Sequence, residues 1–300
     1  MGVALATLPI CQVPAATGHV DTNHDASTVT EPLQEVTVTA QREKLADRLT
    51  AFVGKITGPV FDGGLPLWGM PVCPLVSGLP QEQGEFVLAR VSEIARAGRV
   101  PLAAERCQPN LYILVNTHPQ ELLKTMAKRN FQFTFGISVE PMDGTPIVPS
   151  HIIIDEFITK PGPVRVLYRD APTAAYGVHP SVKAAKVGPI TYSGDTWAGK
   201  SGWYLFRTFV IIDASQLKGV TLGQLADYAA LVGLAEIKPV DSLADAPTIL
   251  QLFNGTPEAS PAGMTEWDQA FLRSLYTTTQ HTSAQQRWHV VQTMMNEITH

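Results

Sequence analysis

The chain has 300 residues, of which 45% are hydrophobic and only 16% are charged, and its formal net charge is −5. This proportion of hydrophobic residues allows a sizeable core. The net charge is negative and the sequence has no cluster of Lys and Arg of the kind that nucleic-acid binding requires. No run approaches the ~20 consecutive apolar residues of a membrane-spanning helix, so we expect no membrane span.

The first residues are typical of a secretory signal peptide. Residues 1–16 are mostly small and apolar and end in Ala15 and Ala16, which suit a cleavage site. We therefore expect a signal peptide over residues 1–16 and a periplasmic or secreted protein. The alternative is a buried N-terminal strand. Residues 17–33 contain few apolar side chains and cannot bury enough surface to stay ordered, which predicts a flexible tail over residues 17–41.

One short strand is predicted inside that tail. In Glu35–Arg42, Val36 and Val38 alternate with β-branched threonines, a pattern that suits an extended segment. The segment resembles the TonB box of TonB-dependent outer-membrane receptors. The resemblance implies an unknown protein partner that adds this strand to the edge of its own sheet. An ordinary edge strand is the alternative. We expect a single globular domain over residues 42–300.

Two cysteines form a candidate disulfide. If Cys11 is removed with the signal peptide, Cys73 and Cys107 remain as an even pair without metal-site spacing. In an oxidising compartment they would form a bridge that closes a loop of about 35 residues and stabilises the fold by about 4 kcal/mol in the chain-entropy model. Two separate buried thiols are the alternative.

The remaining pattern predicts an α+β fold with a small mixed sheet, packed helices and a helical C-terminal third. A capping box at Thr221 and Gln224 marks one helix start. A loop rich in Gly and Pro is expected over 58–80. The expected helices are 42–56, 81–97, 118–129, 246–253, 265–276 and 283–298, and the expected strands are 111–115, 164–168 and 204–213.

Residues 194–201 match the phosphate-binding P-loop motif. The matching positions are Gly194, Gly199, Lys200 and Ser201. A working P-loop needs a helix that begins at its lysine, but the residues that follow have the composition of a strand. We therefore predict an irregular turn there and no cofactor, and we keep a P-loop nucleotide binder as a second alternative function.

The order of elements over residues 205–280 resembles exported zincin-like bacterial proteins of unknown function. The resemblance rests on the strand 204–213 and on a helix that ends in Leu-Val-Gly-Leu at 231–234. In that family an edge strand precedes a His-Glu-x-x-His metal helix. The match places Ala226 and Ala230 where the two histidines stand and Asp227 where the general-base glutamate stands. Alanine cannot bind zinc, so the resemblance implies a degenerate zincin-like scaffold without metal.

These observations favour a non-catalytic binding or accessory protein over an enzyme. The alternative is a periplasmic hydrolase that uses Asp155, Glu156 or Asp227 as general base. His151, Asp155 and Glu156 form a small polar cluster, which we interpret as a solvated turn. The sequence leaves the binding partner and the oligomeric state open.

Overall fold

The computed structural model describes residues 31–57, 65–134, 151–172, 203–240, 242–243, 246–254, 260–278 and 283–299. The chain divides into two compact units, Met1–Arg42 and Glu43–His300. Within the described ranges, no helix combines the length and the apolar character needed to cross a membrane.

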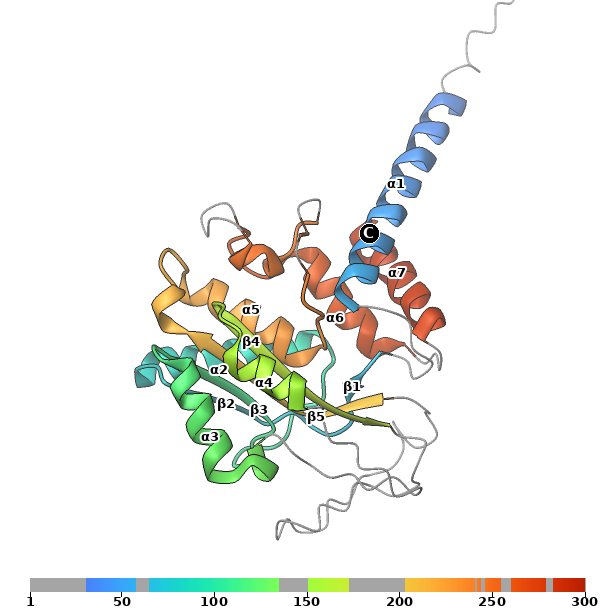
Figure 1. Cartoon of the computed structure of the whole chain (residues 1–300). Coiled ribbons are helices and arrows are strands. Elements are labelled where there is room, and N and C mark those ends of the chain that lie inside the picture. Colours follow the sequence, from blue (N-terminus) through green and yellow to red (C-terminus); the bar gives the residue numbers. More distant parts are fainter. Residues whose placement is uncertain are drawn as a thin grey trace, which may run out of the picture. The chain divides into compact units, whose positions relative to one another are not determined.

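The described residues form a five-stranded mixed sheet with packed helices, which is the expected α+β architecture with a helical C-terminal part (Figure 1). The strands are β1 (Leu67–Trp68), β2 (Pro74–Ser77), β3 (Leu111–Asn116), β4 (Val164–Pro172) and β5 (Trp203–Asp213). The helices are α1 (Glu31–Thr57), α2 (Gln81–Ala97), α3 (Pro119–Thr134), α4 (His151–Thr159), α5 (Leu222–Leu234), α6 (Glu266–Thr277) and α7 (Ser283–Thr299). Two short 3₁₀ helices are η1 (Ala214–Gln216) and η2 (Ile249–Phe253).

Strand β5 organises the sheet. It pairs in parallel with β3, up to the register pair Asn116 and Asp213, and antiparallel with β4 on its other side. Strand β2 extends the sheet in parallel beyond β3, and β1 pairs with the first residues of β5. The carboxyl ends of β2, β3 and β5 therefore lie at one edge of the sheet. Strand β4 begins at that same edge, because its Val164 pairs with Ile212.

The two faces of the sheet carry different helices. On β3, Leu111 and Ile113 belong to the larger core, which also contains buried residues of α2 and α5. Tyr112 and Leu114 contact a smaller cluster that includes Leu123 of α3 and two residues of α4. Helix α3, which follows β3, and helix α5, which follows β5, are therefore on opposite faces of the sheet.

Helix α5 lies at the centre of the larger core. Ten of its thirteen residues are buried, and the capping box predicted at Thr221 and Gln224 has both of its hydrogen bonds. Gly233, near the end of the helix, allows close packing on β3, since an added Cβ would lie 2.9 Å from Cδ1 of Leu111. A larger residue at this position would therefore require the Leu111 side chain to move.

Three aromatic side chains donate hydrogen bonds to the last carbonyls of α5. The last carbonyls of a helix have no partner inside the helix and must be satisfied from outside when they are buried. Donors on three different elements supply the bonds: Tyr168 Oη to the carbonyl of Val232 (2.8 Å), Trp68 Nε1 to that of Gly233 (3.1 Å) and Tyr276 Oη to that of Leu234 (2.7 Å). Strands β4 and β1 and helix α6 are thereby fixed to one helix end.

The structure corrects the expectation of a short strand at Glu35–Arg42, because this segment is part of helix α1. The pattern at residues 42–56 predicted a helix, and Leu49, Phe52 and Ile56 pack it into the core. Once a helix is nucleated, each added residue costs little, and a Val or Thr reduces its stability by only about 0.5 kcal/mol relative to Ala. Extension towards the N-terminus therefore overrides the local β preference.

Two further expectations differ from the structure. The segment 58–80 was expected to be a loop throughout, but it contains β1 and β2. Strand β2 has four residues and is stabilised by parallel pairing with β3, a contact that no local pattern reveals. The segment expected as a helix over 246–253 contains instead the short 3₁₀ helix η2. The side chain of its N-cap residue, Thr248, accepts a hydrogen bond from the Leu250 amide.

We predict that Trp68→Phe lowers the free energy of unfolding by about 1–3 kcal/mol, because it leaves the buried carbonyl of Gly233 without its donor. Urea denaturation followed by circular dichroism measures the effect. Trp288→Phe is the matched control, since Trp288 is 66% exposed and its replacement should change stability by less than about 0.5 kcal/mol. Equal effects of the two substitutions would contradict the role assigned to Trp68.

Candidate functional site

A crevice lies where the carboxyl ends of β3 and β5 meet. The chain leaves these neighbouring parallel strands towards opposite faces of the sheet, and ligands in open α/β sheets bind at such points. The crevice has a volume of about 260 Å³. Its lining includes Thr117, His118, Gly162, Arg165, Asp213 and Gln216.

Arg165 places a buried positive charge in this crevice. Its side chain is only 9% exposed, and Nη1 donates to the carbonyl of Ile158 at 2.9 Å. Its Nε is buried and has no hydrogen-bond partner. Burial lowers the pKa of Arg165, and the charge of Asp213 offsets this effect only in part. The guanidinium remains charged, since arginine does not lose its proton in proteins, and it keeps an unused donor.

Asp213 places a negative charge in the lining of the same crevice. Its carboxylate accepts hydrogen bonds from Ser215 N (3.0 Å), Ser215 Oγ (2.6 Å) and Gln216 Nε2 (2.9 Å). Burial raises the pKa of Asp213, but these hydrogen bonds and the charge of Arg165 outweigh that effect and lower it. Asp213 is therefore ionised at neutral pH.

The first turn of α3 forms the rim of the crevice. The His118 amide donates to Oδ1 of Asn116 at 2.7 Å, and the His118 carbonyl accepts from the amides of Glu121 and Leu122. The exposed His118 ring also lies 3.0 Å from Oγ1 of Thr117, measured at Nδ1. These contacts place the helix start, with its partial positive charge, at the crevice.

Asp155 and Glu156, two of the predicted candidates for a general base, lie elsewhere. Both are exposed residues of helix α4, so the solvated turn expected for this cluster is instead a helix. Glu156 pairs with Lys160 of the same region at 3.1 Å. Neither carboxylate lines the crevice.

Asp227, the third candidate base, is part of a buried ion pair. It is 3% exposed and bonds Arg90 through two contacts, Nε to Oδ1 at 2.6 Å and Nη2 to Oδ2 at 3.1 Å. The Met264 amide donates to the same Oδ2 at 2.6 Å. The hydrogen bond to Asp227 is the main cause that raises the pKa of Arg90. Asp227 therefore joins α5 to α2 and to the segment before α6.

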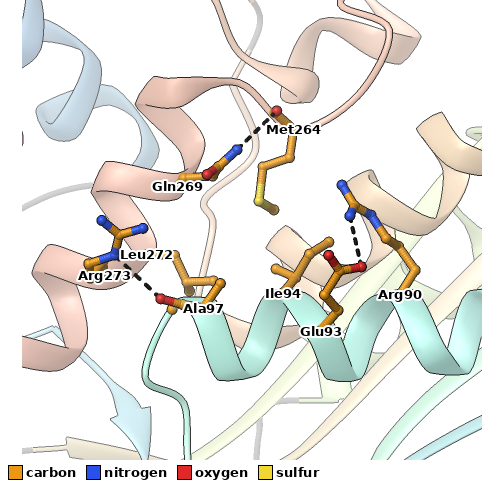
Figure 2. A pocket seen from close by; sticks show the side chains of 9 residues that line it. Arg90, Glu93, Ile94, Ala97, Met264, Gln269, Leu272 and Arg273 are labelled. Atoms are coloured by element: carbon orange, nitrogen blue, oxygen red, sulfur yellow. Dashed lines mark hydrogen bonds and ion pairs between the residues drawn. The ribbon is translucent and has the colours of Figure 1, made fainter. Parts of the chain in front are cut away.

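Beside this ion pair lies a second pocket, of about 140 Å³, between α2 and α6 (Figure 2). Its charged side chains already have partners within the protein. Arg90 also bonds Glu93 at 2.9 Å, and Arg273 donates to the carbonyl of Ala97 at 3.4 Å and pairs with Glu297 at 3.1 Å. We interpret this pocket as a gap between packed helices and the crevice as the better candidate site.

The predicted disulfide is confirmed. Cys73 and Cys107 are bonded, with a Cα–Cα distance of 5.9 Å. The side chain of Asn110 reinforces this region, because it accepts from the Cys73 amide at 2.7 Å and donates to the Pro71 carbonyl at 3.1 Å. The disulfide and the side-chain amide of Asn110 together fix the start of β2 beside the start of β3.

The P-loop-like residues Gly194, Gly199, Lys200 and Ser201 lie outside the described residues, so the irregular turn stays a prediction. The signal peptide and the tail up to residue 30 lie outside them as well. Among the residues that the structure does describe, no group of three or more His, Cys, Asp or Glu side chains could hold a metal ion.

Comparison with protein-family models, with curated proteins and with solved structures finds no match in any of the three. Any function of this protein must therefore be inferred from the geometry of the crevice.

Sequence reasoning missed the crevice, although a signal was present. Polar residues lie at the ends of two of the predicted strands, with Thr117 and His118 after one and Asp213 as the last residue of the other. Parallel strands bring such ends together at one edge of a sheet. Arg165 is different, since an arginine inside a predicted strand gives no indication of the edge at which it will lie.

We predict that Asp227→Asn lowers the free energy of unfolding by about 1–3 kcal/mol, because it removes the countercharge from the half-buried Arg90. Glu93→Gln is the control: this exposed partner of the same arginine should contribute less than about 1 kcal/mol. Urea denaturation of both variants measures the difference, and comparable losses would show that burial of Asp227 is unimportant.

We predict that replacing both Cys73 and Cys107 by serine lowers the free energy of unfolding by about 2–5 kcal/mol, because the unfolded chain regains the freedom that the bridge removes. Unfolding of the unmodified protein with and without a reducing agent provides the control, and reduction should reproduce the loss. Indifference to the reducing agent would indicate that the bridge adds no stability.

Proposed function

We propose that the protein is an exported, non-catalytic binding protein that takes a small polar ligand into the crevice at the carboxyl ends of β3 and β5. The observation that carries this proposal is Arg165, which lines the crevice, is 9% exposed and has a buried Nε without a partner. A buried charged group with unused donors costs stability unless another group interacts with it. A ligand with an acceptor atom would interact with this charge through the Nη2 donors, which the bond from Nη1 to Ile158 leaves unused.

The state of the carboxylates favours binding over catalysis. A general base needs an oxygen that can take a proton from a bound substrate. Both oxygens of Asp227 are already bonded to Arg90, and the hydrogen bonds that lower the pKa of Asp213 make it a weak base. Asp155 and Glu156 lie outside the crevice lining. These arrangements weaken the alternative of a hydrolase that uses Asp155, Glu156 or Asp227.

Export is supported by the disulfide. Bridges of this kind persist in oxidising compartments and are rare in the cytosol, so Cys73 and Cys107 fit a periplasmic or secreted protein. The composition of residues 1–16 points the same way. A protein partner at Glu35–Arg42 stays a prediction, and strand addition there would require this part of α1 to leave its helical conformation.

The zincin-like scaffold also stays a proposal. Helix α5 follows β5 in the chain, as the resemblance of residues 205–280 implies, and Ala226 and Ala230 are fully buried. One feature weighs against it: β5 is paired on both sides, with β3 and with β4, whereas the family's metal helix follows an edge strand.

A ligand screen with crevice-blocking variants tests the proposed function. Thermal unfolding is measured with glucose, free amino acids, succinate, inorganic phosphate and magnesium-ATP, and we expect at least one class to raise the unfolding temperature. Gly162→Leu should abolish the shift by filling the crevice. The fold should tolerate it, since an added Cβ at Gly162 meets only the Val164 carbonyl, at 3.8 Å.

Gly84→Leu is the matched control, because an added Cβ at this position of α2 has no atom within 4 Å. It should leave the shift unchanged. A shift that survives Gly162→Leu would place binding elsewhere, and a magnesium-ATP shift that Lys200→Ala removes would favour the nucleotide-binding alternative. Turnover of simple ester or peptide substrates would overturn the non-catalytic assignment.

A further inference from the structure

The crevice holds two opposite charges that do not neutralise each other directly. Arg165 and Asp213 influence each other's pKa through space, but no direct ion pair joins them. Arg165 lies at the start of β4 and Asp213 at the end of β5, and both line the same space. The lining therefore presents a positive and a negative group, on neighbouring strands, that are not joined by an ion pair.

Each of the two groups has bonding capacity left. A guanidinium has five N–H donors, and of these Arg165 uses one on Nη1, to the carbonyl of Ile158. A carboxylate offers about four acceptor positions, and Asp213 uses three of them. Arg165 can thus donate hydrogen bonds to a ligand, and Asp213 can accept a hydrogen bond from it.

Simpler ligands suit this arrangement less well. A plain anion would meet Arg165 and the positive end of α3, but it would also be repelled by Asp213 and by Glu121 at the rim. A plain cation would be repelled by the buried Arg165. An apolar molecule would offer no acceptor to the Nη2 donors of Arg165, which its hydrogen bond to Ile158 does not use. A ligand that carries both charges can interact favourably with both Arg165 and Asp213.

We infer that the crevice binds a small zwitterion, a free amino acid, with its carboxylate towards Arg165 and the first turn of α3 and its ammonium group towards Asp213. This inference rests on the proposed function, because it names the ligand class of the same crevice. The volume of about 260 Å³ fits a molecule of this size and lies below the ~300–1,000 Å³ of pockets for drug-sized ligands.

The test compares a zwitterion with derivatives that lack one of its charges. Isothermal titration calorimetry of the full-length protein with the free L-amino acids should find at least one with a Kd below about 1 mM. For that amino acid, the N-acetyl derivative removes the positive charge and the amide derivative removes the negative charge. We expect each derivative to bind at least about tenfold more weakly than its parent.

Two variants test which residue contacts the ammonium group of the ligand and which contacts its carboxylate. Asp213→Asn keeps an oxygen to accept from Ser215, and it should weaken the zwitterion about tenfold, whereas the N-acetyl derivative, an anion that Asp213 repels, should bind more tightly. Asp155→Asn is the control, an exposed carboxylate outside the crevice, and it should change neither affinity. Arg165→Lys should weaken the parent and the N-acetyl derivative alike.

The outcomes separate this inference from the proposed function. If no free amino acid binds with a Kd below about 1 mM, or if the derivatives bind as tightly as the parent, the zwitterion assignment is wrong. Binding of another class of compound that Gly162→Leu abolishes would then leave the proposed function standing. Failure of every compound to bind in the crevice would remove both.

Discussion

The fold depends on the way the C-terminal end of α5 is closed. A helix that is buried on nearly all sides cannot satisfy its last carbonyls with water, so the protein must supply donors to them. Tyr168 and Tyr276 each do more than donate. The Tyr168 hydroxyl also accepts from the Ile237 amide at 3.1 Å, and that of Tyr276 accepts from the Trp68 amide at 3.3 Å. Burial raises the pKa of both tyrosines, which keeps both hydroxyls protonated as donors.

The hydrogen bonds at the end of α5 also bear on where the crevice lies. Strand β4 carries Tyr168 and is held to the end of α5, and its antiparallel register with β5 is constant from Val164 to Arg169, before it shifts at Asp170. That register places Arg165, three residues earlier in β4, beside the carboxyl end of β5, where Asp213 stands. A structural contact on one face of the sheet thus positions a charged group that points to the other face.

The sequence predicted most elements, because their patterns are local. Helix α2 has the predicted bounds, and β5 differs from its predicted range by one residue. What could not be predicted depends on contacts between distant residues. Asp268, for example, looks like an ordinary acid in a helix cap, but it is fully buried, and it accepts from Thr248 Oγ1 at 2.5 Å and from the Ile249 amide at 2.8 Å. Burial raises the pKa of Asp268 despite these bonds. The crevice escaped for the same reason, since it exists only once β3, β4 and β5 are paired.

The position of the disulfide has a consequence for association between copies of the chain. Strand β2 is the outermost strand of the described sheet beyond β3, and an edge strand can detach and pair with a second molecule. Exchange of this kind requires the strand and its connecting helix to swing away as a unit. The bridge between Cys73 and Cys107 encloses β2 and α2 in one covalent ring and fastens that ring beside β3. The protein thereby protects its open sheet edge against strand exchange.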